Sequence, residues 1–329
     1  FGRSFIADPD WPLKAQAGHA EDITPCIRCV QCYHIATNRR NVGCSVNPRY
    51  WNESFVAKEL IPAVQSKKIA IIGGGPAGMM AAIMAAKRGH RVILFEKNPW
   101  LGGALHYAAK EYYKEDIKIY LKYLIGQIEK SDVEVHLNTN ATPDLIKNIA
   151  PDVIFSAVGS TPVTPPIPGI HGKNVIGFYE AMDNEAAIGQ NVAIIGGGTI
   201  GAEIGLELAE LRDKNVSIVE ITSELAAQGN MLYKIALRQK MDAVKNLSRL
   251  TETMCTEIRD DGILVKNKDG REGFIPADTV IISTGVAANK QVSESFYDIV
   301  PDTFEIGDCN TPRKIMEAVF EGYTVASHI

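Results

Sequence analysis

The stretch KKIAIIGGGPAGMMAAIMAAKRGHRVILFEK, residues 67–97, has a counterpart later in the chain, NVAIIGGGTIGAEIGLELAELRDKNVSIVE, residues 191–220. In each copy a short apolar run, 69–72 or 192–195, predicts a buried parallel strand. A GGGxxG motif follows, and then an apolar segment of helical length leads to a second strand that ends in glutamate. The chain therefore contains two strand–glycine–helix units of the kind that bind dinucleotides.

The glycines of each motif have separate predicted tasks. The first permits the tight turn out of the strand, the second lets a pyrophosphate approach the backbone, and the third lets helix and strand pack closely. In this order they are Gly73, Gly75 and Gly78 in the first copy and Gly196, Gly198 and Gly201 in the second. The helix that follows offers free N–H groups and its positive dipole end to the phosphates.

A carboxylate closes each unit. Glu96 and Glu220 end the second strands, roughly 20 residues after the first glycine, where an adenosine ribose would present its 2′-hydroxyl. A lone motif is also compatible with a glycine turn that binds nothing. Here each motif has its strand, its helix and its acid, so two nucleotides are predicted.

The composition argues against several classes of protein. The 329 residues are 46% hydrophobic with a formal net charge of −5, as in an ordinary globular chain of about two domains. No strongly basic block appears, so neither nucleic acid nor an anionic membrane is an expected partner. No apolar run reaches the roughly 18–20 residues of a membrane span. The opening FGRSFIADPDWP lacks a signal peptide's apolar core, so a reducing, cytoplasmic compartment is expected.

The stretch TPCIRCVQCYHIATNRRNVGC, residues 24–44, contains four cysteines: Cys26, Cys29, Cys32 and Cys44. In a reducing compartment clustered thiols favour metal binding over disulfides. Three thiols at i, i+3 and i+6, with a fourth further on, can surround a [4Fe–4S] cluster. A structural zinc more often takes two separated Cys-x2-Cys pairs. The spacing favours the cluster, while zinc and incidental cysteines remain alternatives.

Local patterns predict several further elements. Residues 115–129 place an apolar stripe on one face of a helix: Ile117, Tyr120, Leu121, Leu124, Ile125 and Ile128. The alternation in GILVKNKDGREGFIP, residues 262–276, predicts a hairpin around Asp269-Gly270. The proline-rich 160–170 predicts a linker or an extended edge segment.

Residues 66–329 resemble the flavoproteins with two dinucleotide-binding domains, the pyridine-nucleotide disulfide reductases. The resemblance rests on both glycine motifs and on EKNPWLGGAL, FSAVGSTP, IISTGVA and VPDTFEIGDCN. It implies that the first unit and the late Gly-Asp bind FAD, and that the inserted second unit binds NAD(P)H. The implied FAD residues are Gly73, Gly75, Pro76, Ala77, Gly78, Glu96, Lys97, Gly103, Gly159, Gly307 and Asp308. The implied nicotinamide-nucleotide residues are Gly196, Gly198, Thr199, Gly201, Glu220 and Gly285.

A disulfide reductase would need a redox cysteine pair just after the first unit, and NPWLGGALHYAAK contains none. Cys255 and Cys309 are isolated, and each is interpreted as a small buried residue. Electrons are therefore expected to leave the flavin by a route other than thiol–disulfide exchange. A one-electron carrier at the four-cysteine segment would provide one.

The first 48 residues resemble the C-terminal part of the Old Yellow Enzyme-like iron–sulfur flavoproteins, such as 2,4-dienoyl-CoA reductase, enoate reductase and trimethylamine dehydrogenase. The matching motifs are Gly2-Arg3, Ala7-Asp8-Pro9 with Pro12, the four cysteines, and Val46-Asn47-Pro48. In that family an FMN-containing TIM barrel precedes the cluster. The resemblance implies that Gly2 and Arg3 bind the FMN phosphate and that the four cysteines bind the cluster.

The expected fold class is α/β, with two Rossmann-like domains, the second inserted in the first, behind an iron–sulfur loop and a TIM-barrel remnant. The expected domains are 1–24 for the remnant, 25–65 for the iron–sulfur segment, 66–172 with 286–329 for FAD, and 173–285 for NAD(H). Residues 1–3 are expected to end the barrel's eighth strand, and 5–17 to form the following helix. The chain is thus expected to be a fragment, or a subunit that receives its barrel from another chain.

The expected function is electron input. NADH would reduce FAD, and electrons would pass through the cluster to an FMN barrel that reduces an activated C=C bond, such as an enoate or enoyl thioester. NADH is expected rather than NADPH, since Glu220 precedes Ile221, Thr222 and Ser223 and no arginine is available for a 2′-phosphate. The final helix, from about Lys314, would direct its positive end at the flavin. The alternative is structural ADP at the second site, as in trimethylamine dehydrogenase. Association of this chain with copies of itself, as a homo-oligomer, is a further expected form of assembly.

Overall fold

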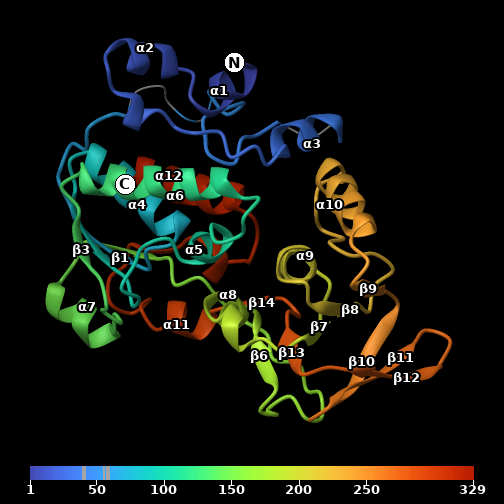
Figure 1. Cartoon of the computed structure of the whole chain (residues 1–329). Helices are drawn as coiled ribbons and strands as arrows, with labels where there is room; N and C mark the ends of the chain where they lie inside the picture. Colours follow the sequence, from blue (N-terminus) through green and yellow to red (C-terminus); the bar gives the residue numbers. More distant parts are fainter. Residues whose placement is uncertain (39–41, 55, 57–59) are drawn as a thin grey trace. The chain divides into compact units, whose positions relative to one another are not determined.

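The computed structural model describes residues 1–38, 42–54, 56 and 60–329, which form two compact units (Figure 1). Unit 1 comprises residues 1–161 and 288–329, and unit 2 comprises residues 162–287. The proline-rich 162–172 belongs to unit 2, whereas the sequence analysis placed the boundary after residue 172. Each unit is built around a five-stranded parallel sheet.

The sheet of unit 1 has the strand order β15-β4-β1-β2-β3. Its strands are β1 Lys68–Ile72, β2 Arg91–Phe95, β3 Glu134–His136, β4 Val153–Ser156 and β15 Thr303–Glu305. The central β1 pairs with β2 and β4 through Ile69, opposite Val92 and Val153. These three side chains are completely buried, because helices cover a parallel sheet on both faces.

The sheet of unit 2 repeats this order as β6-β13-β7-β8-β9. Its strands are β6 Val175–Gly177, β7 Asn191–Ile195, β8 Asn215–Val219, β9 Leu247–Leu250 and β13 Thr279–Ile282. In both sheets the strand before the glycine motif, β1 or β7, lies at the same place in the order. The predicted Rossmann-like fold class is thereby confirmed.

Unit 2 also contains an antiparallel sheet of β10 Thr253–Arg259, β11 Gly262–Asn267 and β12 Glu272–Pro276. The pairing of β11 with β12 is the predicted hairpin. The short strands β5 Ser160–Pro162 and β14 Val286–Ala288 lie where the chain passes from one unit to the other.

The longer helices follow the predicted apolar patterns. Helices α4 Pro76–Lys87 and α9 Thr199–Arg212 begin directly after the two glycine motifs. Helix α6 Glu115–Glu129 has the predicted bounds and buries Tyr120, Leu121, Leu124 and Ile128. Further helices in the two units are α5 Ala104–Ala108, α7 Pro143–Ile149, α8 Phe178–Asp183, α10 Met231–Ala243, α11 Lys290–Glu294 and α12 Ile315–Ser327. Across the part of the chain that the structure describes, none of the helices combines the length and apolar character of a membrane span.

The N-terminal segment departs from the prediction. Gly2 and Arg3 lie in helix α1 Gly2–Ala7, so they do not end a strand, and the helix expected over 5–17 is divided between α1 and α2 Trp11–Gln16. The division occurs at Asp8, because a residue before proline is disfavoured in the α region. Asp8 has φ −150° and ψ 98°.

The buried carboxylate of Asp8 stabilises this turn. It accepts hydrogen bonds from the backbone N–H of Asp10 (3.1 Å) and Thr24 (2.8 Å), and from Lys14 Nζ (2.6 Å). The resulting segment docks on α6, where Thr24 Oγ1 donates to the hydroxyl of Tyr123 at 3.0 Å. Residues 1–24 are therefore part of unit 1 and contact its helix α6.

Helices α4 and α12 approach each other closely at Gly322. A Cβ at this position would stand 2.3 Å from the carbonyl oxygen of Ala77. Gly126, in α6, offers a matched control because no atom of the described chain lies within 4 Å of its would-be Cβ.

We expect Gly322→Ala to lower the free energy of unfolding by about 1–3 kcal/mol, because the helices must separate to admit a methyl group. Gly126→Ala should leave it unchanged or raise it by up to about 1 kcal/mol, since alanine is the better helix former. Urea unfolding of both variants measures the difference. Equal stability of the two variants would contradict the packing argument.

Candidate functional site

Packing within unit 1 fixes the outer two glycines of the first motif. Gly73 has φ +108°, and a Cβ there would lie 2.2 Å from the carbonyl oxygen of Ala157. A Cβ on Gly78 would lie 1.9 Å from the carbonyl oxygen of Gly73. At Gly75, by contrast, the nearest atom is Gly103 Cα at 4.0 Å. The protein's own packing does not require the middle glycine, and open space lies in front of it.

The second motif repeats this pattern in unit 2. Gly196 has φ +103° and would clash with the carbonyl oxygen of Ser283 at 2.2 Å, and Gly201 would clash with Gly196 at 2.0 Å. Beyond its own neighbours, Gly198 has no atom of the described chain within 4 Å of its would-be Cβ. Both loops therefore leave room for a group that approaches the backbone, as a pyrophosphate does.

The helices after the motifs begin with free N–H groups. Gly75 and Gly198 are the N-caps of α4 and α9, and among the described residues no side chain caps either helix. Pro76 and Ala77 form the first turn of α4, and Thr199 begins α9. Uncapped N–H groups and the positive dipole end together fit a phosphate.

Each terminal glutamate is bonded to its own glycine loop. Glu96 Oε2 accepts the N–H of Gly74 at 2.8 Å, and Glu220 Oε2 accepts the N–H of Gly197 at 2.7 Å. Their second oxygens accept the N–H groups of Asn98 and Thr222, both at 2.8 Å. These bonds orient each carboxylate beside its loop, which the motif spacing alone did not reveal. Lys97, beyond Glu96, is exposed.

Three distant segments meet at the first loop. A Cβ on Gly103 would stand 3.0 Å from Gly75 Cα, and one on Gly307 would stand 2.9 Å from Ala77 Cβ. The N–H of Gly307 donates to Glu321 Oε2 of α12 at 2.7 Å. The structure thus brings Gly102-Gly103, Gly307-Asp308 and α12 to the start of α4.

Asp308 is held in a partly buried position. Burial raises the pKa of its carboxyl group above the usual range, while the backbone N–H of Arg313 (3.1 Å) and Ser160 Oγ (3.3 Å) donate to it and oppose that rise. Gly159, just before Ser160, and Gly285, at the corresponding point of unit 2, have φ +69° and +101°. Beyond their neighbours, neither would-be Cβ has an atom of the described chain within 4 Å.

Helix α3 Gln31–Thr37 contains Cys32. Cys26 and Cys29 precede this helix in the chain, and Cys44 follows it. Burial, and to a smaller extent the nearby thiols of Cys29 and Cys26, raise the pKa of the Cys44 thiol to about 11. Cys32 has a raised pKa for the same reasons in the same order. Ser45 Oγ lies 3.2 Å from Cys29 Sγ. The thiols are therefore electrostatic neighbours in a partly buried site.

Zinc and a [4Fe–4S] cluster require different separations of the four sulfur atoms. With Zn–S bonds of about 2.3 Å, zinc would bring its sulfur ligands to about 3.8 Å from one another. Within the described residues, no three of the four sulfur atoms lie within 4.8 Å of one another. A [4Fe–4S] cluster binds each thiolate on a separate iron atom and so accepts wider spacing. Elsewhere in the described chain, the side-chain ligand atoms of His19, Glu21 and Asp22 lie within 4.8 Å of one another. Lys130 forms ion pairs with both of these acids.

The backbone between the cysteines adopts a strained shape. Arg28 and Val30 have φ +47° and +57°, which is rare for residues with side chains and especially for a β-branched one. Arg28 is held there by an ion pair with Asp116 of α6. Left-handed residues in such turns direct N–H groups into concavities that bind anions, including iron–sulfur clusters. No glycine occupies these positions, so the left-handed turns could not be predicted from the residue types.

The cysteine segment lies beside the first turn of α12. A Cβ on Gly43 would stand 3.2 Å from Met316 Sδ. Cys26, Cys29 and Cys44 pack against the core that also contains α4 and α12. Gly2 and Arg3 are exposed on α1, whose Ile6 carbonyl oxygen accepts a hydrogen bond from Asn47 Nδ2 at 2.8 Å.

Comparison with known proteins gives a consistent set of relatives. The family profile "Pyridine nucleotide-disulphide oxidoreductase" matches residues 67–322. An NADH oxidase of Thermoanaerobacter brockii is 35% identical over 100% of this chain and 51% of its own length. A cinnamate reductase of Clostridium sporogenes is 33% identical over 100% of this chain and 49% of its own length.

A solved structure of 2-naphthoyl-CoA reductase with 2-naphthoyl-CoA has 34% identity and a TM-score of 0.95. It covers 99% of this chain, which covers 50% of that structure's chain. The chain thus spans about half the length of the relatives it matches. The resemblance to enoate-reductase-like enzymes is confirmed.

The strain at Val30 can be measured. A left-handed conformation costs a residue with a Cβ about 1–2 kcal/mol, which glycine does not incur. Val292 is a matched control site. It is half exposed in helix α11, and its backbone does not have a positive φ. We expect Val30→Gly to be more stable than Val292→Gly by about 1–2 kcal/mol in urea unfolding. The opposite order would show that the left-handed turn is not strained.

Proposed function

Because the chain belongs to the pyridine nucleotide-disulphide oxidoreductase family, we propose that it is the electron-input part of an enoate-reductase-like enzyme. In this proposal NADH reduces FAD, and electrons leave through a [4Fe–4S] cluster. The observation that carries it is the pair of loops in which packing fixes the outer glycines and leaves the middle one facing open space. Such space is needed only when a ligand approaches the backbone.

We assign FAD to the first loop. The N–H groups at the start of α4 would bind its pyrophosphate, Glu96 its adenosine ribose, and Asp308 its ribityl chain. The N-terminal end of α12 would face the flavin ring. When bound, FAD accepts a hydride from NADH and releases electrons singly, while the protein supplies position and electrostatics.

We assign NADH to the second loop. The start of α9 would bind its pyrophosphate, and Glu220 would accept a hydrogen bond from its ribose 2′-hydroxyl. Glu220 is already oriented by Gly197 and Thr222, and the carboxylate would repel a 2′-phosphate. This arrangement supports NADH over NADPH, and the intact glycines favour a nicotinamide nucleotide over structural ADP.

We assign the cluster to Cys26, Cys29, Cys32 and Cys44. The neighbouring thiols, the left-handed turns between them and the contact of Gly43 with Met316 in α12 support this assignment. The final acceptor would be an FMN-containing TIM barrel, in the same polypeptide or a separate subunit. Exposed Gly2 and Arg3 would contact its FMN phosphate.

The proposed substrate of the whole enzyme has an activated C=C bond, as in an enoate or an enoyl thioester. The names of two relatives, cinnamate reductase and 2-naphthoyl-CoA reductase, support this class. We further propose a cytoplasmic location and assembly as a homo-oligomer.

The electron-input proposal predicts rapid loss of oxidised-flavin absorbance when NADH is mixed anaerobically with the FAD-loaded chain. Gly198→Ala should retain FAD and slow this bleaching about tenfold or more, since its methyl group would occupy the proposed pyrophosphate space. Gly75→Ala is the matched variant. It should lose FAD instead, while its thermal stability without FAD stays that of the wild type. If excess NADH does not bleach the wild-type flavin, a structural nucleotide at the second site is the better reading.

The cluster proposal predicts about four iron and four sulfide per chain after anaerobic preparation. Cys44→Ser should reduce the iron content and remove the cluster's visible absorption. Cys255→Ser, at an isolated buried thiol outside the segment, should retain both. Elemental analysis that finds about one zinc and no iron would refute the assignment.

A further inference from the structure

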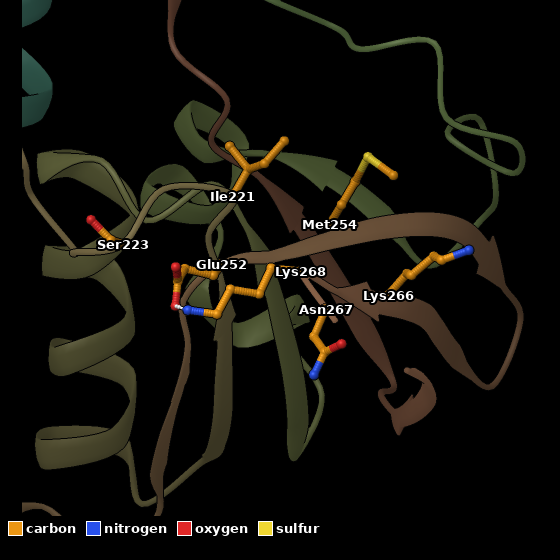
Figure 2. Close-up of a pocket in the computed structure, with 7 residues that line it drawn as sticks. All are labelled: Ile221, Ser223, Glu252, Met254, Lys266, Asn267 and Lys268. Carbon is orange, nitrogen blue, oxygen red and sulfur yellow. Dashed lines mark hydrogen bonds and ion pairs between the residues drawn. The ribbon is translucent and has the colours of Figure 1, made fainter. Parts of the chain in front are cut away.

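A pocket of about 350 Å³ lies within unit 2 beside the second loop (Figure 2). Its lining residues come from the segment after β8, from β10 and the residue before it, and from β11 and the residue after it: Ile221, Ser223, Glu252, Met254, Lys266, Asn267 and Lys268. The volume is at the lower end of the range for ligand pockets, so it suits one end of a dinucleotide rather than all of it. Ile221 and Met254 are 67% and 47% exposed, so both present apolar surface that a flat ring could cover.

Backbone hydrogen bonds join this pocket to Glu220, the residue assigned to the ribose. The N–H of Thr253 donates to the carbonyl oxygen of Glu220 at 2.9 Å, and the N–H of Glu252 donates to that of Thr222 at 2.8 Å. Ile221 follows Glu220 directly in the chain. A base attached to a ribose at Glu220 therefore has the apolar wall of Ile221 and Met254 within its reach.

The cations of the pocket are already paired. Lys268 Nζ lies 2.6 Å from Glu252 Oε2. Figure 2 shows these two lining side chains pointing toward each other. The backbone N–H of Lys268 also donates to the carbonyl oxygen of Glu252 at 2.9 Å, which holds the two residues together. Lys266 points away from this pair and approaches Glu272 at 3.7 Å.

With the adenosine end of the nucleotide taken to lie in this pocket, we propose that Glu252 selects against a 2′-phosphate by occupying Lys268. This inference rests on the proposed function of the second loop. A 2′-phosphate beside Glu220 would meet a second carboxylate at Glu252, while the ammonium group of Lys268 is already engaged by Glu252 and that of Lys266 approaches Glu272. Glu252 is thus a specificity-determining residue that acts through a neighbouring lysine.

The test compares the binding of two probes, ADP-ribose and 2′-phospho-ADP-ribose, by calorimetry on the full chain. Glu252→Gln should increase the affinity for 2′-phospho-ADP-ribose relative to ADP-ribose about threefold to tenfold, because Lys268 becomes available to the phosphate. Glu257→Gln is the matched control. Its carboxylate pairs with Arg259 at 2.9 Å on the same strand, and it does not line the pocket.

The double variant Glu252→Gln/Lys268→Gln should return to the wild-type affinity ratio. The inference is overturned if Glu252→Gln leaves the ratio unchanged, if Glu257→Gln raises it equally, or if the increase persists without Lys268. If neither probe binds to the wild type or to any variant, the proposed function of the second loop fails together with this inference. Both side chains are partly exposed, at 40% and 61%, so the substitutions are not expected to prevent folding.

Discussion

The rest of this structure depends on one close contact, made in both units, between the third glycine of a loop and the carbonyl oxygen of the first. A Cβ on Gly78 or Gly201 would stand 1.9 or 2.0 Å from that oxygen, so only glycine allows the helix to begin at the end of its strand. In unit 1 the same turn places Ala77 where Gly307 and Gly322 approach it. The N–H groups at the start of α4, the late Gly-Asp and the final helix therefore share one local constraint.

Sequence analysis predicted the parts of the fold that local physics determines. The bounds of α6 follow from an apolar stripe of helical period, and both strand–loop–helix units follow from residues within about 30 positions of one another. The N-terminal prediction failed because it overlooked a local restriction and a contact that forms only in the folded chain. Asp8 ends a helix under the restriction of Pro9, but its carboxylate is bound by Lys14 and Thr24.

The same distinction divides the candidate site. Motif spacing identified the glycines and Glu96, whereas the bond from Gly74 to that glutamate required the folded loop. The left-handed turns at Arg28 and Val30 had no glycine to announce them, since an ion pair and cysteine packing maintain them instead. The pocket beside Glu220 could not be predicted either, because its walls come from segments up to 47 residues apart in the chain, from Ile221 to Lys268.

The placement of the cysteine segment connects these features to the proposed function. Just after the last cysteine, Asn47 donates a hydrogen bond to the carbonyl oxygen of Ile6 in α1. Just before it, Gly43 contacts Met316 in α12. The segment is thus held between the helix that would meet the FMN phosphate and the helix that would meet the FAD ring. Electron transfer between cofactors needs fixed separations more than it needs reactive side chains, and a site on packed elements provides them. On the proposed function, the cysteines would therefore need only to hold a cluster at a fixed place between these helices, and the contacts at Asn47 and Gly43 would keep it there.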